Sequence, residues 1–321
     1  MLTSTTTAAV ERALDLYPLH IVILNWNLPD DTIACVRSIR AHPTPNVEII
    51  IVDNASADDS LQIFRDQLGD SVTIIANAEN LGFAAGVNVG IRHALAAGTR
   101  AVVLLNNDTL VDPALIEQLV AAARDIPSAD ILGPVIYYHQ LPDRIWRVAD
   151  QEHRWLPIPL RTPDAVVARA GARPFPVDYV TACGVLIKRA VFETIGLFDE
   201  NYFMYFEDAD FCRRARRAGF GIWCVPAARM WHKVSLSARK DKPSSRYAMS
   251  WGRARFYRRH PHGPAPVLTT LYLIWKMART TLADALAGDW ELVRPLWAGT
   301  WDGYRNRPPR RGAFSRGAGA P

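Results

Sequence analysis

The sequence predicts an α/β fold: a mostly parallel sheet flanked by helices, with a helical extension at the C-terminal end. Apolar runs of strand length alternate with helix-like stretches through the first half of the chain, across short connections. This alternation is typical of a parallel sheet covered on both faces. The runs are nearly continuous in Ile, Val and Leu, as is typical of buried parallel strands.

Five apolar runs are expected to form strands, at residues 20–24, 47–52, 72–75, 101–105 and 131–136. Helices are expected between most of them, at residues 31–41, 57–68, 83–97 and 113–124. Residues 137–180 are rich in Pro, Arg and Trp without a clear period, which indicates a long excursion such as a hairpin or lid. Regular patterning begins again at residues 180–188. Helices are then expected at 190–195 and 208–218, and a strand at 221–226.

The C-terminal part changes to helical periodicity, at residues 245–259 and 267–286. In the second of these helices an apolar stripe recurs three and four residues apart, at Leu268, Leu271, Trp275, Ala278 and Leu282. We therefore divide the chain into a loose N-terminal tail (1–18), an α/β domain (19–237), a helical extension (238–305) and a disordered tail rich in Pro, Arg and Gly (306–321).

The 321 residues are 49% hydrophobic and 21% charged, which excludes a disordered, collagenous or disulfide-stapled protein. Four separated cysteines form no CxxC pair and no zinc spacing, so we expect reduced thiols in a cytosolic setting. The first residues lack the basic and apolar segments of a secretory signal. The longest uncharged apolar run, 263–275, is shorter than the roughly 20 residues of a membrane span. These observations predict a cytoplasmic protein.

Charge is distributed unevenly along the chain. From Arg229 to the C-terminus there are 18 Lys and Arg against 5 Asp and Glu, whereas from Met1 to Ala228 there are 19 against 27. This asymmetry indicates a carboxylate-bearing site in the first part and contact with an anionic surface in the second. The alternative is a basic tail that only aids solubility.

Small polar and acidic residues follow four of the predicted strands. They occur in the segments 25–27, 53–60, 80–88 and 106–109. Because ligands of parallel sheets bind beyond the carboxyl ends of the strands, we expect these residues to surround a polar, hydroxyl-rich ligand. One such residue is more often a helix cap, but four segments in succession favour a site.

Among these residues, Asp108 is the strongest candidate for a metal ligand. A carboxylate at the end of a buried strand, two residues after Asn106, suits Mg²⁺ or Mn²⁺ that bridges the phosphates of a nucleotide. Asp53 could accept hydrogen bonds from a base or ribose, and Gly82 and Gly86 would let the backbone approach a ligand closely. The structural alternatives are a helix cap at Asp108 and an Asx turn at Asp53.

A further group of candidates lies at the start of the helix predicted from residue 208. Glu207, Asp208 and Asp210 stand there together, where the helix dipole favours negative charge. The aromatic residues before them would desolvate a carboxyl group, raise its pKa and make it a useful base. His232 follows the last predicted strand and a turn at 226–228, as a candidate ligand or a structural histidine.

Taken in order, these segments resemble the family 2 glycosyltransferases of the GT-A fold, and among them the bacterial rhamnosyltransferase-like members. The resemblance covers residues 19–237 and rests on ILNWN, VDNASADDS, NLGFAAGVNVGI, LLNNDT, GLFDENYFMYFEDADFCRRARRAGF and a His after VPAA. The AGTWDG segment of the extension is similar as well. The resemblance implies inverting transfer of a sugar, with rhamnose a candidate, from a dTDP-, UDP- or GDP-linked donor to an acceptor hydroxyl in cell-surface polysaccharide or glycolipid synthesis.

By position, the resemblance implies a nucleotide-sugar site at the strand ends. Its members are Asn25, Asp53, Asn80, Gly86, Asn106 and Asn107, with Asp53 on the base or ribose. Residues 106–108 stand where the family has its Asp-x-Asp motif, so Asp108 would hold the Mg²⁺ or Mn²⁺ ion and His232 would add a metal contact. Because Asn106 replaces the first Asp, the motif has one charged ligand fewer.

The resemblance also implies that Asp208 is the general base, with Glu207 beside it in the catalytic group. The chemistry fits these residue types, since a divalent ion neutralises a diphosphate leaving group and a carboxylate takes the proton of the attacking hydroxyl. A single displacement needs no enzymic nucleophile. The sequence offers no Ser/His/Asp or Cys/His arrangement that would supply one.

Two other function classes remain open. A nucleotidyltransferase uses a similar sheet and metal, but it would need a Gly-rich basic loop after the first strand, where this chain has Asn25-Trp26-Asn27. A non-catalytic nucleotide-sugar or carbohydrate-binding protein would not need both Asp108 and Asp208. Nucleic acid is not an expected partner, because no aromatic residues are interleaved on a basic sheet face.

The expected partners are a sugar nucleotide and a carbohydrate or lipid-linked glycan acceptor. The basic C-terminal part and the apolar stripe at 268–282 would rest on an anionic membrane, placing the protein peripherally on the inner face of the cell membrane. The alternative is that the stripe packs against the catalytic domain.

Overall fold

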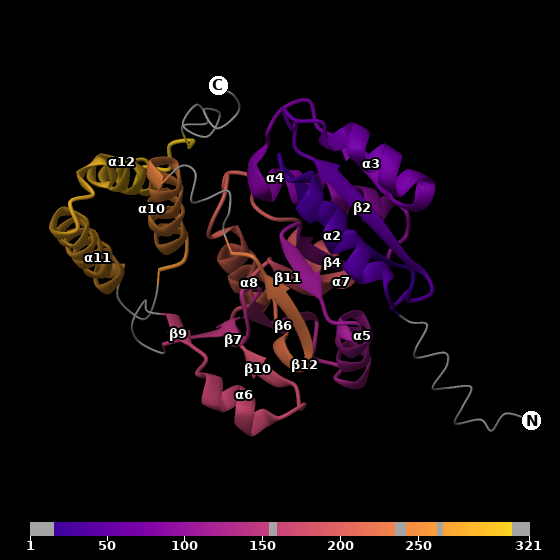
Figure 1. Cartoon of the computed structure of the whole chain (residues 1–321). Coiled ribbons are helices and arrows are strands. Elements are labelled where there is room, and N and C mark those ends of the chain that lie inside the picture. The colour runs from indigo at the N-terminus through magenta and orange to yellow at the C-terminus, as the bar shows by residue number, and fades with distance from the viewer. Residues whose placement is uncertain (1–15, 154–158, 235–241, 262–265, 310–321) are drawn as a thin grey trace, which may run out of the picture.

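The computed structural model describes residues 16–153, 159–234, 242–261 and 266–309. Ten strands form one sheet in the order β10-β12-β6-β11-β4-β1-β2-β3, with β5 paired to β12 and β7 paired to β6. Helices pack around this sheet, and α10, α11 and α12 form a group of their own beside it (Figure 1). The predicted α/β fold with a helical extension is confirmed.

The first half follows the expected alternation. Its elements are β1 (Leu19–Asn25), α2 (Pro29–Arg40), β2 (Val47–Asp53), α3 (Ser60–Leu68), a 3₁₀ turn (Gly69–Ser71), β3 (Thr73–Ala76), α4 (Gly82–Ala96) and β4 (Ala101–Asn106). The strands β4, β1, β2 and β3 are neighbours and run parallel. Asn25 is opposite Asp53 in this register, so the polar residues that end β1 and β2 lie side by side.

The second half mixes strand directions. Its elements are β5 (Thr109–Val111), α5 (Leu115–Asp125), β6 (Ile131–Tyr138), β7 (Leu141–Arg147), β8 (Asp150–Glu152), β9 (Pro159–Arg161), α6 (Asp164–Ala170), β10 (Phe175–Val177), β11 (Gly184–Lys188), α7 (Arg189–Ile195), α8 (Glu207–Arg217) and β12 (Ile222–His232). Strand β11 runs antiparallel to both neighbours, β4 and β6. The excursion after residue 137 contains the β6–β7 hairpin and the β8–β9 pair.

Strand β12 is longer than expected and ends at His232 itself. It passes through residues 226–228 with a register shift between Val225 and Arg229, which is a bulge rather than a turn. Beyond the bulge it pairs with β6 on one edge and with β5 on the other, where His232 is opposite Thr109. The prediction that a turn separates this strand from His232 is therefore wrong, because pairing on both edges carries the strand through.

Alternate side chains of the central strands feed two apolar cores. Val22 of β1 joins the core that includes residues of α4, α7 and α8. Its neighbours Ile21 and Ile23 join the core that includes residues of α2, α3 and α5. Because successive residues of a strand point to opposite faces, the continuous apolar runs of the sequence produce a sheet buried on both sides.

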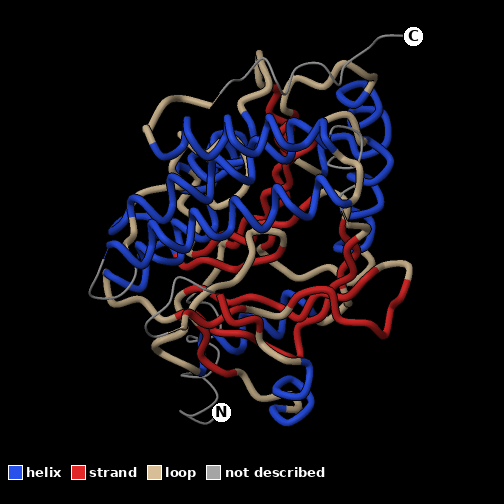
Figure 2. The backbone as a smooth tube through the Cα atoms, turned by 90° about the vertical axis from the view of Figure 1, so that its left-hand side faces the viewer, coloured by secondary structure: helices blue, strands red, loops and turns tan. Residues whose placement is uncertain are grey.

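Helices α10 (Lys242–Arg259), α11 (Pro266–Leu286) and α12 (Val293–Tyr304) form the extension, with a 3₁₀ turn at Trp290–Leu292. When the left-hand side of Figure 1 faces the viewer, long helices lie in front of the sheet (Figure 2). A Cβ at Gly299 would lie 2.4 Å from the Tyr247 carbonyl oxygen, and one at Gly303 would lie 2.3 Å from that of Trp251. The two glycines of the AGTWDG segment therefore allow the backbones of α10 and α12 to touch.

Packing extends into both expected tails. Leu16 is buried, and the Pro18 carbonyl accepts a hydrogen bond from the Arg100 N–H (2.8 Å). At the other end, the Arg307 carbonyl accepts the indole N–H of Trp251 (2.9 Å). The rest of the two tails, 1–15 and 310–321, and residues 238–241 of the extension lie outside the described residues.

Replacing Gly303 with Ala is expected to destabilise the protein by about 1–3 kcal/mol, the usual cost of overpacking. The added methyl group would meet the backbone of Trp251, so no side-chain rotation relieves the clash. Thermal or urea unfolding measures the loss, with Arg294→Ala at an exposed position of the same helix as the control. If both variants were as stable as the parent, α10 and α12 would not be in close contact in solution.

Candidate active site

Several of the predicted strand-end residues form one hydrogen-bonded cluster at the carboxyl edge of β1, β2 and β4. The Asn25 amide donates to Asp53 Oδ1 (2.8 Å), and the Thr32 hydroxyl donates to Asn25 Oδ1 (2.8 Å). The Asn107 amide donates to the same Asn25 oxygen from the loop after β4 (3.3 Å). Asn25 and Asp53 are both buried, so this cluster fixes the edge of the sheet from within.

The carboxylate of Asp53 has further partners in the protein. Besides Asn25, it accepts the backbone N–H of Ser56 (3.0 Å) and the Ser56 hydroxyl (2.6 Å). This Asx-type turn is the structural alternative considered for Asp53, and it fixes the start of the loop between β2 and α3. Contact of Asp53 with a base or ribose stays a prediction beside this turn.

Asn80 ties the loop after β3 to the start of α4. Its side-chain oxygen accepts the N–H of Gly82 and the amide of Asn54, both at 2.9 Å. Asn54 also donates to the Gly82 carbonyl and accepts from the Asn77 amide and the Leu81 N–H. The sequence pattern does not single out Asn54, because an Asn after a strand is common in turns.

The two glycines of the α4 segment serve close packing. Gly82 has φ +81°, and a Cβ there would lie 2.4 Å from the Phe203 carbonyl oxygen. A Cβ at Gly86 would lie 2.7 Å from Leu24 Cδ1 of β1. These contacts explain both glycines by packing, and contact of Gly86 with a nucleotide stays a prediction.

Strand pairing brings Asp108 and His232 together from distant parts of the sequence. Strand β5 begins directly after Asp108 and pairs with the end of β12, which His232 closes. His232 Nε2 lies 3.0 Å from Asp108 Oδ1, and the two side chains are 5% and 10% exposed. The ring of Trp146 packs edge-on against His232, with ring centroids 4.5 Å apart. The pair is therefore largely shielded from water.

The geometry of this pair fits two ligands of a divalent ion. Neighbouring ligands of an octahedral ion at about 2.1 Å lie about 3.0 Å apart, which is the distance found here. His232 Nε2 is the ring nitrogen that faces Asp108. The other ring nitrogen, Nδ1, is buried without a hydrogen-bond partner in the described part of the chain. Within the same residues no group of three or more His, Cys, Asp or Glu is suited to a metal. The described residues therefore offer two side chains, Asp108 and His232, that would hold such an ion.

The three carboxyl groups at the start of α8 have different environments. Burial, and then the charge of Asp208, raises the pKa of Glu207 well above its ordinary value and favours its neutral form. Burial would also raise the pKa of Asp210, but hydrogen bonds from His260 (2.8 Å) and Arg214 (2.7 Å) lower it on balance. Asp208 is half-buried and, among the described residues, has no ion pair. It is thus the accessible carboxylate of the three.

Tyr179 holds Asp208 in position. Its hydroxyl donates to Asp208 Oδ2 at 2.6 Å, while the Ala209 N–H donates to Oδ1 at 2.8 Å. Burial and the charge of Asp208 raise the pKa of Tyr179 well above 10, so the hydroxyl remains a donor at ordinary pH. Sequence reasoning missed Tyr179 because it lies near the end of the segment 137–180, which has no readable period.

The chain enters α8 through two aromatic residues with left-handed backbone. Tyr205 and Phe206 have φ of +72° and +71°, a conformation that is costly for bulky residues. Helix α10 covers this turn, because a Cβ at Gly252 would lie 2.7 Å from the Tyr205 carbonyl oxygen. The extension therefore supports the segment that positions Asp208.

Asp108 and Asp208 both lie close to the segment around Cys183. The Asn106 N–H donates to the Cys183 carbonyl (2.9 Å), and the Ala182 N–H lies 3.4 Å from Asp208 Oδ2. Burial, and then the charges of Asp108 and Asp208 among others, raises the pKa of Cys183. The predicted metal ligand and the predicted base therefore belong to one region of the molecule.

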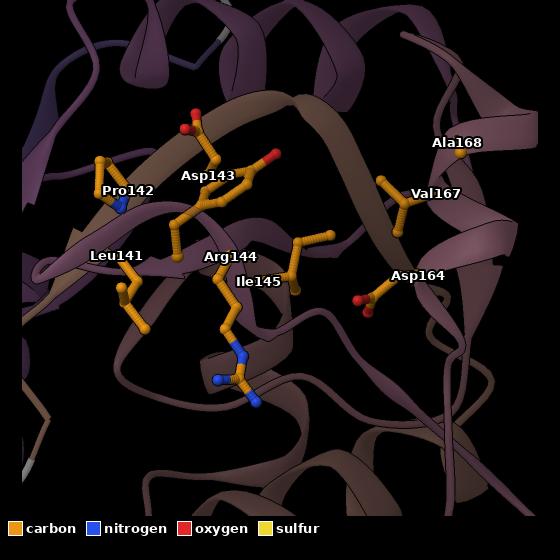
Figure 3. Close-up of a pocket in the computed structure, with 9 residues that line it drawn as sticks. Leu141, Pro142, Asp143, Arg144, Ile145, Asp164, Val167 and Ala168 are labelled. Carbon is orange, nitrogen blue, oxygen red and sulfur yellow. The ribbon is translucent and has the colours of Figure 1, made fainter.

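A hollow of about 690 Å³ lies between the β6–β7 hairpin and α6. Tyr137, Ile145 and Val167 contribute to its lining, and none of the predicted site residues does (Figure 3). Trp146, the neighbour of Ile145, packs against His232 instead. Since neighbouring residues of a strand point to opposite faces, β7 separates this hollow from the Asp108–His232 pair.

Comparison with known proteins places the chain in a family. A family model described as "Glycosyltransferase like family 2" matches residues 18–260. The chain is 28% identical over 218 residues to the low-salt glycan biosynthesis hexosyltransferase Agl10 of Haloferax volcanii, covering 64% of this chain and 63% of that protein. It is 27% identical over 197 residues to the dTDP-rhamnosyl transferase RfbF of Shigella flexneri, covering 59% and 60%. The match thus spans about three fifths of each of these relatives.

A third relative is the N-acetylglucosaminyl-diphospho-decaprenol L-rhamnosyltransferase of Mycobacterium tuberculosis, 30% identical over 231 residues, covering 62% of this chain and 70% of that protein. Among solved structures, GalNAc-T7 with UDP, GalNAc and Mn²⁺ superposes with a TM-score of 0.60 at 15% identity, covering 80% of this chain and 57% of that one. Mannosyltransferase PcManGT from Pyrobaculum calidifontis, with GDP-Man and Mn²⁺, superposes with a TM-score of 0.56 at 14% identity, covering 94% of both chains. These likenesses show a GT-A fold, and the family match over residues 18–260 shows that the chain belongs to glycosyltransferase family 2.

Proposed function

We propose that this chain is an inverting, metal-assisted glycosyltransferase that moves a hexosyl residue from a nucleoside diphosphate sugar to an acceptor hydroxyl. The observation that supports it most directly is that the segment 182–183 contacts both parts of the site. The Asn106 N–H, two residues before Asp108, donates to the Cys183 carbonyl (2.9 Å), and the Ala182 N–H lies 3.4 Å from Asp208 Oδ2. Transfer needs a group for the leaving diphosphate and a base for the acceptor within one site. A protein that only binds sugars needs no positioned base.

The names of the relatives support the substrate classes. RfbF is named a dTDP-rhamnosyl transferase, and the mycobacterial relative is named for rhamnosyl transfer to N-acetylglucosaminyl-diphospho-decaprenol. For this chain we therefore place a dTDP-linked sugar such as rhamnose ahead of UDP- and GDP-linked donors. The acceptor proposed is a glycan on a lipid carrier, in cell-surface polysaccharide or glycolipid synthesis.

Asp108 and His232 would hold the Mg²⁺ or Mn²⁺ ion. A bound divalent ion supplies positive charge that neutralises the departing diphosphate. The neighbouring residues keep Asp108 in place, because the Asn107 amide donates to Asn25 and Thr32, and the Lys233 N–H donates to the Asp108 carbonyl (3.0 Å). The donor diphosphate would thus meet a site whose backbone is fixed before binding.

Asp208 would take the proton from the acceptor hydroxyl as that hydroxyl attacks the anomeric carbon. Tyr179 and the Ala209 N–H orient its two oxygens by hydrogen bonds. Glu207 favours its neutral form, which limits the repulsion between adjacent carboxyl groups. One displacement from the opposite face inverts the anomeric configuration without an enzymic nucleophile.

Asp108→Ala is expected to abolish metal-dependent nucleotide binding. One of dTDP, UDP, GDP and CDP, together with Mn²⁺, should raise the melting temperature of the parent, because a ligand that binds only the folded state stabilises it. At a hundredfold excess over Kd the gain is about 2.7 kcal/mol, which corresponds to a shift of several degrees. Scanning fluorimetry measures the shift, with Asp66→Ala at an exposed carboxylate of α3 as the control.

Equal shifts in Asp108→Ala and the parent would overturn the metal role of Asp108. A folded parent that shifts with no nucleotide would favour a non-catalytic carbohydrate-binding protein. The melting temperature of the control variant should rise with nucleotide as that of the parent does. Asp66 is exposed on α3, and its carboxylate accepts a hydrogen bond from Gln62 of the same helix (2.8 Å) rather than from a predicted site residue.

Asp208→Asn keeps the size of the side chain but removes the proposed base. We expect kcat to fall by about 10²- to 10⁴-fold, while the nucleotide-induced melting shift is retained because the Asp108–His232 pair is intact. Release of the nucleoside diphosphate during transfer reports kcat. A loss of less than tenfold would show that another group removes the proton.

Tyr179→Phe removes the hydroxyl that orients Asp208 and leaves the ring. We expect kcat to fall by roughly tenfold, the value of one hydrogen bond to a charged group, with an unchanged KM for the donor. Tyr138→Phe, in the nearby β6–β7 hairpin, is the matched control. A rise in the donor KM without a fall in kcat would place Tyr179 in donor binding instead.

A further inference from the structure

The outward face of α11 is apolar. Leu271, Trp275 and Leu282 are 56%, 54% and 61% exposed, although they are large hydrophobic side chains. Residues three and four apart lie on one side of a helix, so they form a continuous surface. We call this surface the outer face; it consists of Val267, Leu268, Leu271, Ile274, Trp275, Leu282 and Leu286. The alternative that the stripe packs against the catalytic domain is therefore wrong.

The inward side of α11 is more polar than its outer face. Thr269 and Asp284 are buried there, and Asp284 pairs with Arg246 of α10 at 2.8 Å. Leu273 joins a small apolar cluster with Phe256 of α10. A helix of a water-soluble protein ordinarily turns its apolar side to the core. Helix α11 reverses this pattern, which indicates an apolar partner for the outer face.

Three further exposed tryptophans follow α11 in the chain. Trp290, Trp297 and Trp301 are 67%, 50% and 53% exposed. The Trp297 indole donates to the Thr281 hydroxyl of α11 at 3.0 Å, so the exposed side of α12 adjoins α11. Tryptophan is enriched where protein meets the headgroup layer of a bilayer, because its ring is apolar and its N–H is polar.

The border of the outer face is basic. Burial, and then the charges of Arg253 of α10 and of Arg279, lowers the pKa of Lys276, so Lys276 and Arg279 stand near one another on α11. In the described part of the chain, neither Lys276 nor Arg279 has a carboxylate partner, and Arg279 lies over the Trp275 ring at 5.7 Å. The first acidic residue of α11 is the buried Asp284. The exposed side of this helix therefore presents positive charge beside apolar surface.

We propose that the outer face of α11 binds the headgroup layer of an anionic lipid bilayer, with the helix lying along the membrane plane. Apolar area, interfacial tryptophans and Lys/Arg together are the features of helices that lie on membranes. No helix among the described residues has the length and hydropathy to cross one. A second copy of the chain fits less well, since it would bring two basic borders together.

Flotation of the full chain with lipid vesicles tests the proposal. The parent should bind vesicles of phosphatidylcholine mixed with phosphatidylglycerol more strongly than vesicles of phosphatidylcholine alone, and high salt should weaken binding. The double variant Leu271→Gln/Trp275→Gln should bind at least roughly tenfold more weakly, because it removes two apolar side chains from the contact. Lys276→Gln/Arg279→Gln should lose the preference for anionic vesicles.

The matched control is Leu141→Gln/Val166→Gln, which changes two exposed apolar residues of β7 and α6 and should bind as the parent does. Circular dichroism and melting temperature confirm that each variant is folded, as expected for exposed positions. Equal flotation of the parent and Leu271→Gln/Trp275→Gln, or a parent that binds neither vesicle, would overturn the proposal. A parent dimer that this variant dissociates, without vesicle binding, would assign the face to a second copy. None of these readouts depends on the sugar transfer proposed above.

Discussion

Backbone pairing on both edges of β12 is the constraint on which the site depends. The strand runs parallel to β6 and antiparallel to β5, and β5 begins at the residue after Asp108. His232 is opposite Thr109 in this register, so its distance from Asp108 follows from the sheet rather than from attraction between the side chains. A β12 that ended at its bulge would leave His232 on a loop. Two polar groups can then be held together in a dry environment, because many backbone hydrogen bonds fix where they lie.

Tertiary partners give three neighbouring carboxyl groups three different properties. A helix turns about a third of a circle with each residue, so Glu207, Asp208 and Asp210 meet different surroundings. Asp210 stays charged because it bonds to His260, the residue that follows α10, and a buried charge with partners costs far less than one without. Glu207 is buried with one oxygen unpaired among the described residues, and it favours the neutral form. The extension thus takes part in the electrostatics of α8, the helix that carries the proposed base.

Local pattern predicts the elements of this fold better than their long-range relations. The strands and helices of the first half lie within a few residues of their expected bounds, because apolar runs and helical spacing are local signals. The antiparallel direction of β11 has no such signal, since a buried strand has the same apolar composition in either direction. For the same reason, motif order identified Asp108, His232 and Asp208 as candidates, whereas Tyr179 emerged only from its 2.6 Å contact with Asp208. Periodicity located the stripe on α11 but could not tell which side the protein covers.

The charge asymmetry of the sequence separates into two parts in the structure. Some basic residues of the extension are neutralised within the protein, as Arg255 is by Asp199 of the catalytic domain (3.0 Å) and Arg246 by Asp284 (2.8 Å). These pairs attach α10 to the catalytic domain and α11 to α10. Lys276 and Arg279 are left at the border of an apolar helix face, without carboxylate partners in the described ranges. An excess of basic residues therefore says little about partners until the internal pairs are removed, and what remains here lies beside exposed Leu and Trp side chains, where positive charge and apolar area act on the same partner.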